Sequence, residues 1–70
     1  MNSTYTAIVK QVGDWWIGWV EEVPGVNAQE KTKEALLASL KEILREAIEF
    51  NRAEARDAAE SNYAEEPIAV

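Results

Sequence analysis

The chain has no cysteine and no histidine, only three glycines and two prolines, and no long apolar run. Without cysteine it can form no disulfide bond, and without either residue type it lacks the usual ligands of a zinc site. No stretch approaches the roughly 18 apolar residues of a membrane-spanning helix, and the N-terminus does not resemble a signal peptide. We therefore expect a cytoplasmic protein with no membrane association, no metal and no other cofactor.

The length of 70 residues suits one small domain, and 47% of the residues are hydrophobic. A domain of this size buries only about 60% of the surface that its unfolded chain exposes, so its core is marginal. Because neither disulfides nor a metal reinforce that core, association is the remaining common source of stability. We expect a single domain over residues 1–70 that forms a homo-oligomer, either a dimer or a tetramer.

Acidic residues outnumber basic residues by 13 to 7, which gives a net charge of −6. Nucleic-acid binding depends largely on Lys and Arg contacts to phosphates, so this balance argues against direct nucleic-acid binding. It fits a basic protein partner, although an acidic surface also serves plain solubility. The charge by itself leaves both interpretations open.

The first 20 residues predict a β-hairpin. Tyr5–Val12 is rich in β-branched residues, Gly13 and Asp14 provide a two-residue turn, and a second strand with three tryptophans follows at Trp15–Val20. In this register Val12 faces Trp15, and alternate residues share a face of the sheet. One face carries Ile8, Lys10, Val12, Trp15, Ile17 and Trp19, and the other carries Tyr5, Ala7, Val9, Trp16, Gly18 and Val20.

The two faces of this hairpin are expected to have different covers. Ala7 and Gly18 are small, so a helix can approach the face that they share. The opposite face holds two tryptophans and two isoleucines, and exposed apolar clusters of this kind usually mark association sites. The candidate interface therefore consists of Ile8, Val12, Trp15, Ile17 and Trp19.

A turn and a helix cap are predicted beyond the hairpin. Pro24 and Gly25 end the second strand, Val26–Gln29 forms a short third strand, and Thr32 is a good helix N-cap. Apolar residues then recur at spacings of three and four as far as Phe50, which predicts an amphipathic helix of about 20 residues or slightly more.

The fold class predicted from these elements is α+β, with a hairpin and a short third strand packed on one long helix. Residues 4–52 form the core of the domain, and residues 53–70 are a helix extension followed by a tail or an edge strand. Pro67–Val70 is the segment that decides between these two alternatives, since pairing there would change βββα into βββαβ.

The segment from Gly13 to Leu44 resembles the HicB-like antitoxin family. Val23-Pro24-Gly25-Val26 corresponds to the family's Leu-Pro-Gly-Cys turn, Thr32 to its helix-capping threonine at the same distance, and Leu37 with Ser39-Leu40-Lys41-Glu42 to its helix pattern. The chain departs from the family where Val26 replaces the cysteine, Glu30 the glycine before the threonine, and Ala35-Leu36 a Glu-Ala pair.

This resemblance implies a truncated RNase H-like fold and a role in a type II toxin–antitoxin pair. Members of the family bind and mask a small basic toxin of the HicA type, which cleaves mRNA. Many members also carry a C-terminal DNA-binding segment. The residues after Asn51 are too few and too acidic for one, so we expect no DNA-binding segment in this chain.

The sequence fits two other classes of function, a nuclease and an RNA-binding protein, less well. An RNase H-type nuclease needs clustered carboxylates to hold a divalent metal, but Asp14 lies in the turn and the neighbours Glu21 and Glu22 point to opposite faces. We therefore expect no enzymatic activity. Trp15 and Trp19 also resemble a stacking platform for single-stranded RNA, although Lys10 is the only basic residue expected beside them. The remaining alternative to an antitoxin is a stand-alone homo-oligomeric interaction module with no toxin partner.

Overall fold

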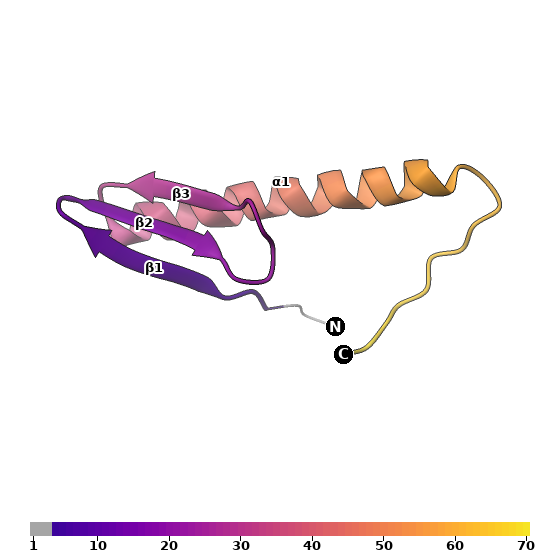
Figure 1. Cartoon of the computed structure of the whole chain (residues 1–70), viewed down its shortest axis with the longest axis horizontal. Helices are drawn as coiled ribbons and strands as arrows, with labels where there is room; N and C mark the ends of the chain where they lie inside the picture. The colour runs from indigo at the N-terminus through magenta and orange to yellow at the C-terminus, as the bar shows by residue number, and fades with distance from the viewer. Residues whose placement is uncertain (1–3) are drawn as a thin grey trace.

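The computed structural model describes residues 4–70, which form a three-stranded antiparallel sheet covered on one face by a long helix (Figure 1). Strands β1 (Ala7–Val12), β2 (Trp15–Val20) and β3 (Asn27–Glu30) lie in the order β1-β2-β3, and helix α1 spans Lys33–Ala59. The predicted α+β class with a βββα order is confirmed. No strand follows α1 in the described part of the chain, so the βββαβ alternative is wrong for this structure.

The hairpin has the predicted register, in which Val12 pairs with Trp15 and Ile8 with Trp19. Gly13 adopts a φ of 61°, whereas the φ of Asp14 is not positive. A positive φ at the first central position alone fits a type II′ turn, which matches the twist of the strands that it joins. The two-residue turn therefore determines which side chains share a face.

The third strand begins and ends one residue later than the predicted Val26–Gln29. Val26 lies before the strand, its carbonyl accepts a hydrogen bond of 3.0 Å from the Val20 N–H, and its side chain is buried. Val26 therefore contributes to the buried cluster on the helix side of the sheet from a position just before β3. Pro24 and Gly25, which has a φ of 89°, form the preceding turn as predicted.

The core lies between α1 and the face of the sheet that carries the small residues. Its fully buried members are Val20, Val26, Leu36 and Leu40, with Ala7, Val9, Trp16, Val23, Ala28, Ile43, Leu44 and Ala47 packed around them. Gly18 is the point of closest approach, because a Cβ there would lie 2.7 Å from the Ile8 carbonyl oxygen and 3.1 Å from a Leu36 methyl carbon. The helix therefore covers the predicted face.

Helix α1 is tied to the sheet at its start and free of it at its end. The Thr32 hydroxyl accepts a 3.1 Å hydrogen bond from the Ala35 N–H, which confirms the predicted cap. Ser39 donates a 2.6 Å hydrogen bond to the Glu30 carboxylate of β3. Every residue from Asn51 onward is exposed, and the helix runs past the sheet (Figure 1). Within residues 4–70, no helix combines the length and apolarity needed to cross a membrane.

Candidate protein-binding face

The five predicted interface residues all lie on the side of the sheet that faces away from α1. We call this surface the tryptophan face and define it as Ile8, Val12, Trp15, Ile17 and Trp19. Trp15 is 39% exposed, Trp19 43% and Val12 50%, while Ile8 and Ile17 are half-buried. Since α1 occupies the opposite side of the sheet, the helix leaves these side chains uncovered.

The layout of the tryptophan face follows from strand pairing. Trp19 lies between Ile8 of β1 and Asn27 of β3, and Ile17 lies between Lys10 and Gln29. Directly opposed side chains on one face are close enough to contact, so the two strands of the hairpin supply an apolar centre. The short β3 supplies amides at one border. An apolar centre with a polar rim is the usual composition of a protein interface.

A second basic residue, which sequence analysis missed, lies at this face. The Nζ atom of Lys31 is 4.1 Å from the centroid of the Trp15 ring, a cation–π contact that favours one orientation of the indole. Lys10 is therefore not the only cation beside the tryptophans, which corrects the expectation from the sequence. The position of Lys31 follows from the register of β3. Trp16 pairs with Glu30, so the next residue, Lys31, comes opposite Trp15.

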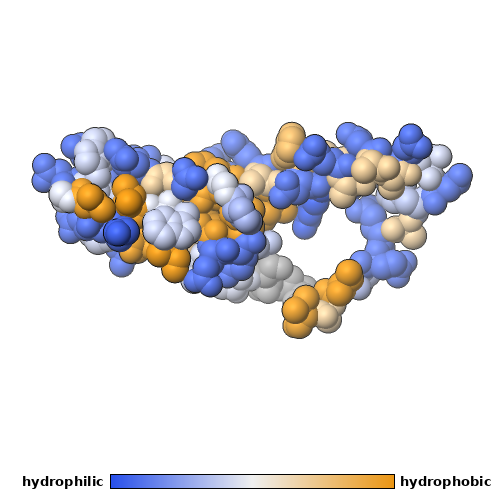
Figure 2. Space-filling view, in the orientation of Figure 1, coloured by the Kyte–Doolittle hydropathy of each residue, from blue (hydrophilic) through white to orange (hydrophobic). Residues whose placement is uncertain are grey.

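The net negative charge of the chain is not concentrated on the tryptophan face. The strand positions that point to this side carry Lys10 and no acidic residue, and Lys31 adds a second positive charge. Residues 60–70, in contrast, contain Glu60, Glu65 and Glu66 and no basic residue. In Figure 2 orange and pale side chains mix over the sheet and blue ones surround them. Acidity can steer a partner at a distance, but contact at this face is mainly apolar.

Comparison of the chain with models of protein families, with curated proteins and with solved structures finds no match. The likeness to the HicB-like family therefore stays a prediction that depends on the residues between Gly13 and Leu44.

The acidic residues after β2 have a structural partner. One Glu22 carboxylate oxygen accepts a 2.7 Å hydrogen bond from the Thr6 N–H, and the Glu21 N–H donates a 2.9 Å bond to the Thr6 carbonyl. The bond from Thr6 stabilises the ionised form, so the pKa of Glu22 is lowered from its ordinary value of 4.5. Across residues 4–70, no group of three or more His, Cys, Asp or Glu side chains is placed to hold a metal ion.

The turn and cap residues lie apart from the tryptophan face. Pro24 and Gly25 belong to the β2–β3 loop, and the Gly25 carbonyl accepts a 3.4 Å hydrogen bond from the Asn27 side-chain amide. Thr32 holds the first turn of α1. These residues hold the loop and the helix start in place.

Proposed function

We propose that this chain is an antitoxin-like protein of a type II toxin–antitoxin pair, which binds and masks a small basic mRNA-cleaving toxin of the HicA type. The observation that carries the proposal is the pair of exposed indoles, Trp15 and Trp19, on the sheet face that α1 does not cover. The resemblance of the turn and helix motifs to the HicB-like family supplies the identity of the partner class.

Tryptophan is the side chain that most often dominates the energy of a protein interface, because it buries a large apolar area with little loss of side-chain freedom. The tryptophan face is nevertheless small. Six residues of strand and two strand spacings give about 20 Å by about 10 Å, whereas a stable interface buries roughly 800 Å² on each partner. The toxin therefore also contacts the rim of the sheet, and the indoles act as its central anchors.

The net charge of −6 supports a basic partner through its effect on association. Opposite net charges accelerate the encounter of two proteins and lose this effect as salt screens them. The apolar centre of the tryptophan face then determines how slowly the complex dissociates. This division predicts an association rate that falls with salt and a dissociation rate that changes little.

A second candidate function is a stand-alone homo-oligomeric module with no toxin partner. The local charge of the tryptophan face weighs against a basic toxin, since the strand positions and the loop residue described there carry Lys10 and Lys31, which would meet a basic partner unfavourably. In this alternative the apolar face is covered by other copies of the same chain.

The experiment that separates the two functions is size-exclusion chromatography with light scattering at physiological salt. The chain is run alone and mixed with any small basic protein that is encoded beside its gene. Trp19→Ala is compared with Phe50→Ala, which removes an aromatic side chain that is 62% exposed on α1, away from the sheet. We expect a mixed complex that Trp19→Ala weakens by about tenfold or more and Phe50→Ala leaves intact. A homo-oligomer that ignores the basic protein would support the second function instead.

A further inference from the structure

The two edges of the sheet differ in how well they are protected against pairing with another chain. The edge strand β3 has four residues, three of them polar, and short polar strands are poor templates for a further strand. The other edge strand, β1, has six residues, no proline and no bulge, and Lys10 is its one charged residue. Among the common protective features of edge strands, β1 therefore has only this lysine.

Half of the backbone groups of β1 point to the open edge. The Glu21 N–H bonds to the Thr6 carbonyl, so Thr6 and every second residue after it direct their backbone groups toward β2. Ala7, Val9 and Gln11 therefore direct theirs away from β2. Within residues 4–70 β1 pairs with no other strand, so these groups are available to a strand of another chain.

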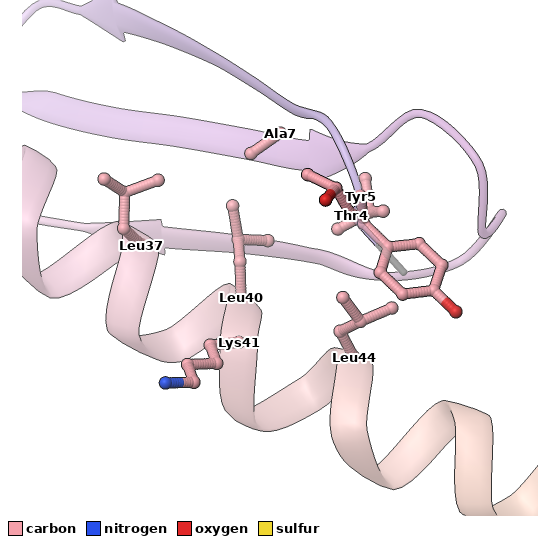
Figure 3. Close-up of a pocket in the computed structure, with 8 residues that line it drawn as sticks. Thr4, Tyr5, Ala7, Leu37, Leu40, Lys41 and Leu44 are labelled. Carbon is pink, nitrogen blue, oxygen red and sulfur yellow. The ribbon is translucent and has the colours of Figure 1, made fainter. Parts of the chain in front are cut away.

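Helix α1 does not close this edge. It packs mainly against β2 and β3 and leaves an open groove of about 290 Å³ beside the start of β1, lined in part by Tyr5, Ala7, Leu37 and Leu44 (Figure 3). Leu37 is 44% exposed there. A further strand can therefore approach β1 in the plane of the sheet without displacing the helix.

The sequence of β1 is complementary to itself in one antiparallel register. When Ile8 lies opposite Ile8 of a second copy, Ala7 pairs with Val9 and Lys10 with the neutral Thr6 of the other chain. The residues that point to the open edge then form the hydrogen-bonded pairs. Moving the centre of pairing to Val9 or Lys10 brings the two Lys10 side chains together, which is unfavourable, and moving it the other way shortens the paired segment.

Pairing in this register also joins the two tryptophan faces. Ile8 lies opposite Trp19 across the hairpin, so the row from Trp19 to Ile8 in one copy continues into Ile8 and Trp19 of the other. The twofold axis is perpendicular to the sheet, which keeps both helices on one side. The joined face is about 25 Å wide instead of about 10 Å. This width brings it closer to the roughly 800 Å² that a stable interface buries on each partner.

We propose that two copies of this chain pair through β1 and form a continuous six-stranded antiparallel sheet with Ile8 at the twofold axis. The edges that remain are the two short, polar β3 strands, so the assembly closes at two copies. Both tryptophan faces stay exposed in this dimer. The proposal therefore does not depend on the proposed antitoxin function.

Disulfide cross-linking tests the register, since the chain has no cysteine of its own. Ile8→Cys places two thiols in a non-hydrogen-bonded pair, where opposed Cα atoms lie about 4.5 Å apart, within the range of a disulfide bond. We expect a cross-linked dimer after mild oxidation with diamide, read by non-reducing electrophoresis.

Lys10→Cys and Thr6→Cys are the matched controls for the cross-link. Four residues of strand, about 13 Å, separate each of these positions from its own copy, so neither variant alone is expected to cross-link. An equal mixture of the two is expected to cross-link, because Lys10 of one copy lies opposite Thr6 of the other. Cross-linking of Lys10→Cys alone, or none in the mixture, would overturn the proposed register.

Sedimentation equilibrium of the full-length chain tests the use of the edge. Gln11→Pro removes an N–H that points away from β2, and an edge strand tolerates proline at such a position. We expect a wild-type dimer whose dissociation constant rises by about tenfold or more in Gln11→Pro and stays unchanged in Gln11→Thr and in Trp19→Ala. A monomeric wild type, or a dimer that Trp19→Ala disrupts and Gln11→Pro does not, would overturn the proposal. Thermal melts confirm that each variant is folded.

Discussion

At the scale of single residues, Gly18 shows how far the sequence determines the arrangement of the sheet and the helix. Its place on the same face as Ala7 predicted a close approach of the helix, and the structure places Leu36 and Leu40 against it. The spacing alone did not show that the nearest obstacle to a side chain is backbone, the carbonyl of Ile8. A backbone atom yields less readily than the end of a side chain, so this position tolerates no Cβ without movement of the strand.

Gly18→Ala is therefore expected to destabilise the fold by roughly 1–3 kcal/mol, the usual cost of overpacking a well-packed core. Gly25→Ala serves as a comparison, since a Cβ at that position would meet no atom within 4 Å and only the positive φ opposes the change. Urea denaturation followed by tryptophan fluorescence measures both. Equal stability of Gly18→Ala and wild type would show that Gly18 is not packed this closely against the Ile8 carbonyl and the Leu36 side chain.

The hydrogen bond from Thr6 to Glu22 makes stability depend on pH. Because the pKa of the Glu22 carboxyl is lower in the folded chain than its ordinary value of 4.5, the bond contributes fully above that value. Its contribution is lost as the pH falls from 4.5 through the folded pKa. We expect Glu22→Gln to lose less stability over this acidic range than wild type does.

Thermal melts between neutral pH and the acidic range test the Glu22 prediction. Glu21→Gln is the matched control, because it removes the same charge from the neighbouring position, whose carboxylate makes no hydrogen bond in the described residues. Parallel pH profiles for wild type and Glu22→Gln would contradict the prediction.

Lys31 is the residue that sequence analysis could not place. Its contact with Trp15 depends on the pairing of β3 with β2, and a strand of four residues between loops carries too little periodicity to indicate its register. The hairpin register, in contrast, followed from a turn of two residues. The residues of the two-residue turn predicted the pairing of β1 with β2. The longer loop between β2 and β3 did not predict the pairing of those two strands.

At the scale of elements, α1 divides into a packed half and an exposed half. Its apolar residues as far as Ala47 contact the core, while residues 51–59 are exposed throughout. The sequence predicted an apolar helix face as far as Phe50 and then an extension with alanine as its only apolar residue type, but Phe50 itself is 62% exposed. What it left open was the tail, since Pro67–Val70 suited an edge strand or a loose segment equally well and the choice depends on a distant edge.

The start of α1 is expected to depend on its cap. Thr32→Ala removes the acceptor of the Ala35 N–H and is predicted to cost about 1 kcal/mol of stability. Thr32→Ser keeps the hydroxyl and should stay close to wild type. Chemical denaturation measures both variants, and an Ala variant as stable as the Ser variant would show that the cap adds nothing.

At the scale of the whole molecule, the sheet has two surfaces with different roles. One packs on α1 to make the small core, and the other presents the tryptophan face. The molecule measures 52 × 22 × 15 Å, because α1 extends beyond a sheet that covers only its first half. A chain with such a small core and an exposed aromatic face is expected to gain stability from a bound partner, by an amount that rises with the logarithm of the ratio of the partner's concentration to its dissociation constant.

The candidate site was predictable from the sequence because alternation along a strand assigns each side chain to a face. The strand pairing places all five predicted residues on one side of the sheet, whereas their role as an interface stays a prediction. The partner was not predictable by the same means, since exposure and apolarity indicate that a surface binds but not what it binds. Lys10 and Lys31 show why the net charge does not identify the partner. The net charge of the chain is negative, whereas the local charge of the tryptophan face is positive.

Hydroxyl-radical footprinting of the wild-type chain, alone and mixed with any small basic protein encoded beside its gene, is the decisive experiment for the tryptophan face. Mass spectrometry reads the three tryptophans separately, and Trp16 on the helix side and Phe50 on α1 are internal controls. If a partner covers the tryptophan face, oxidation of Trp15 and Trp19 is expected to be slower in the complex than in the free chain. The oxidation rates of Trp16 and Phe50 are expected to be the same in both. A stable complex that leaves Trp15 and Trp19 as reactive as in the free chain would contradict it.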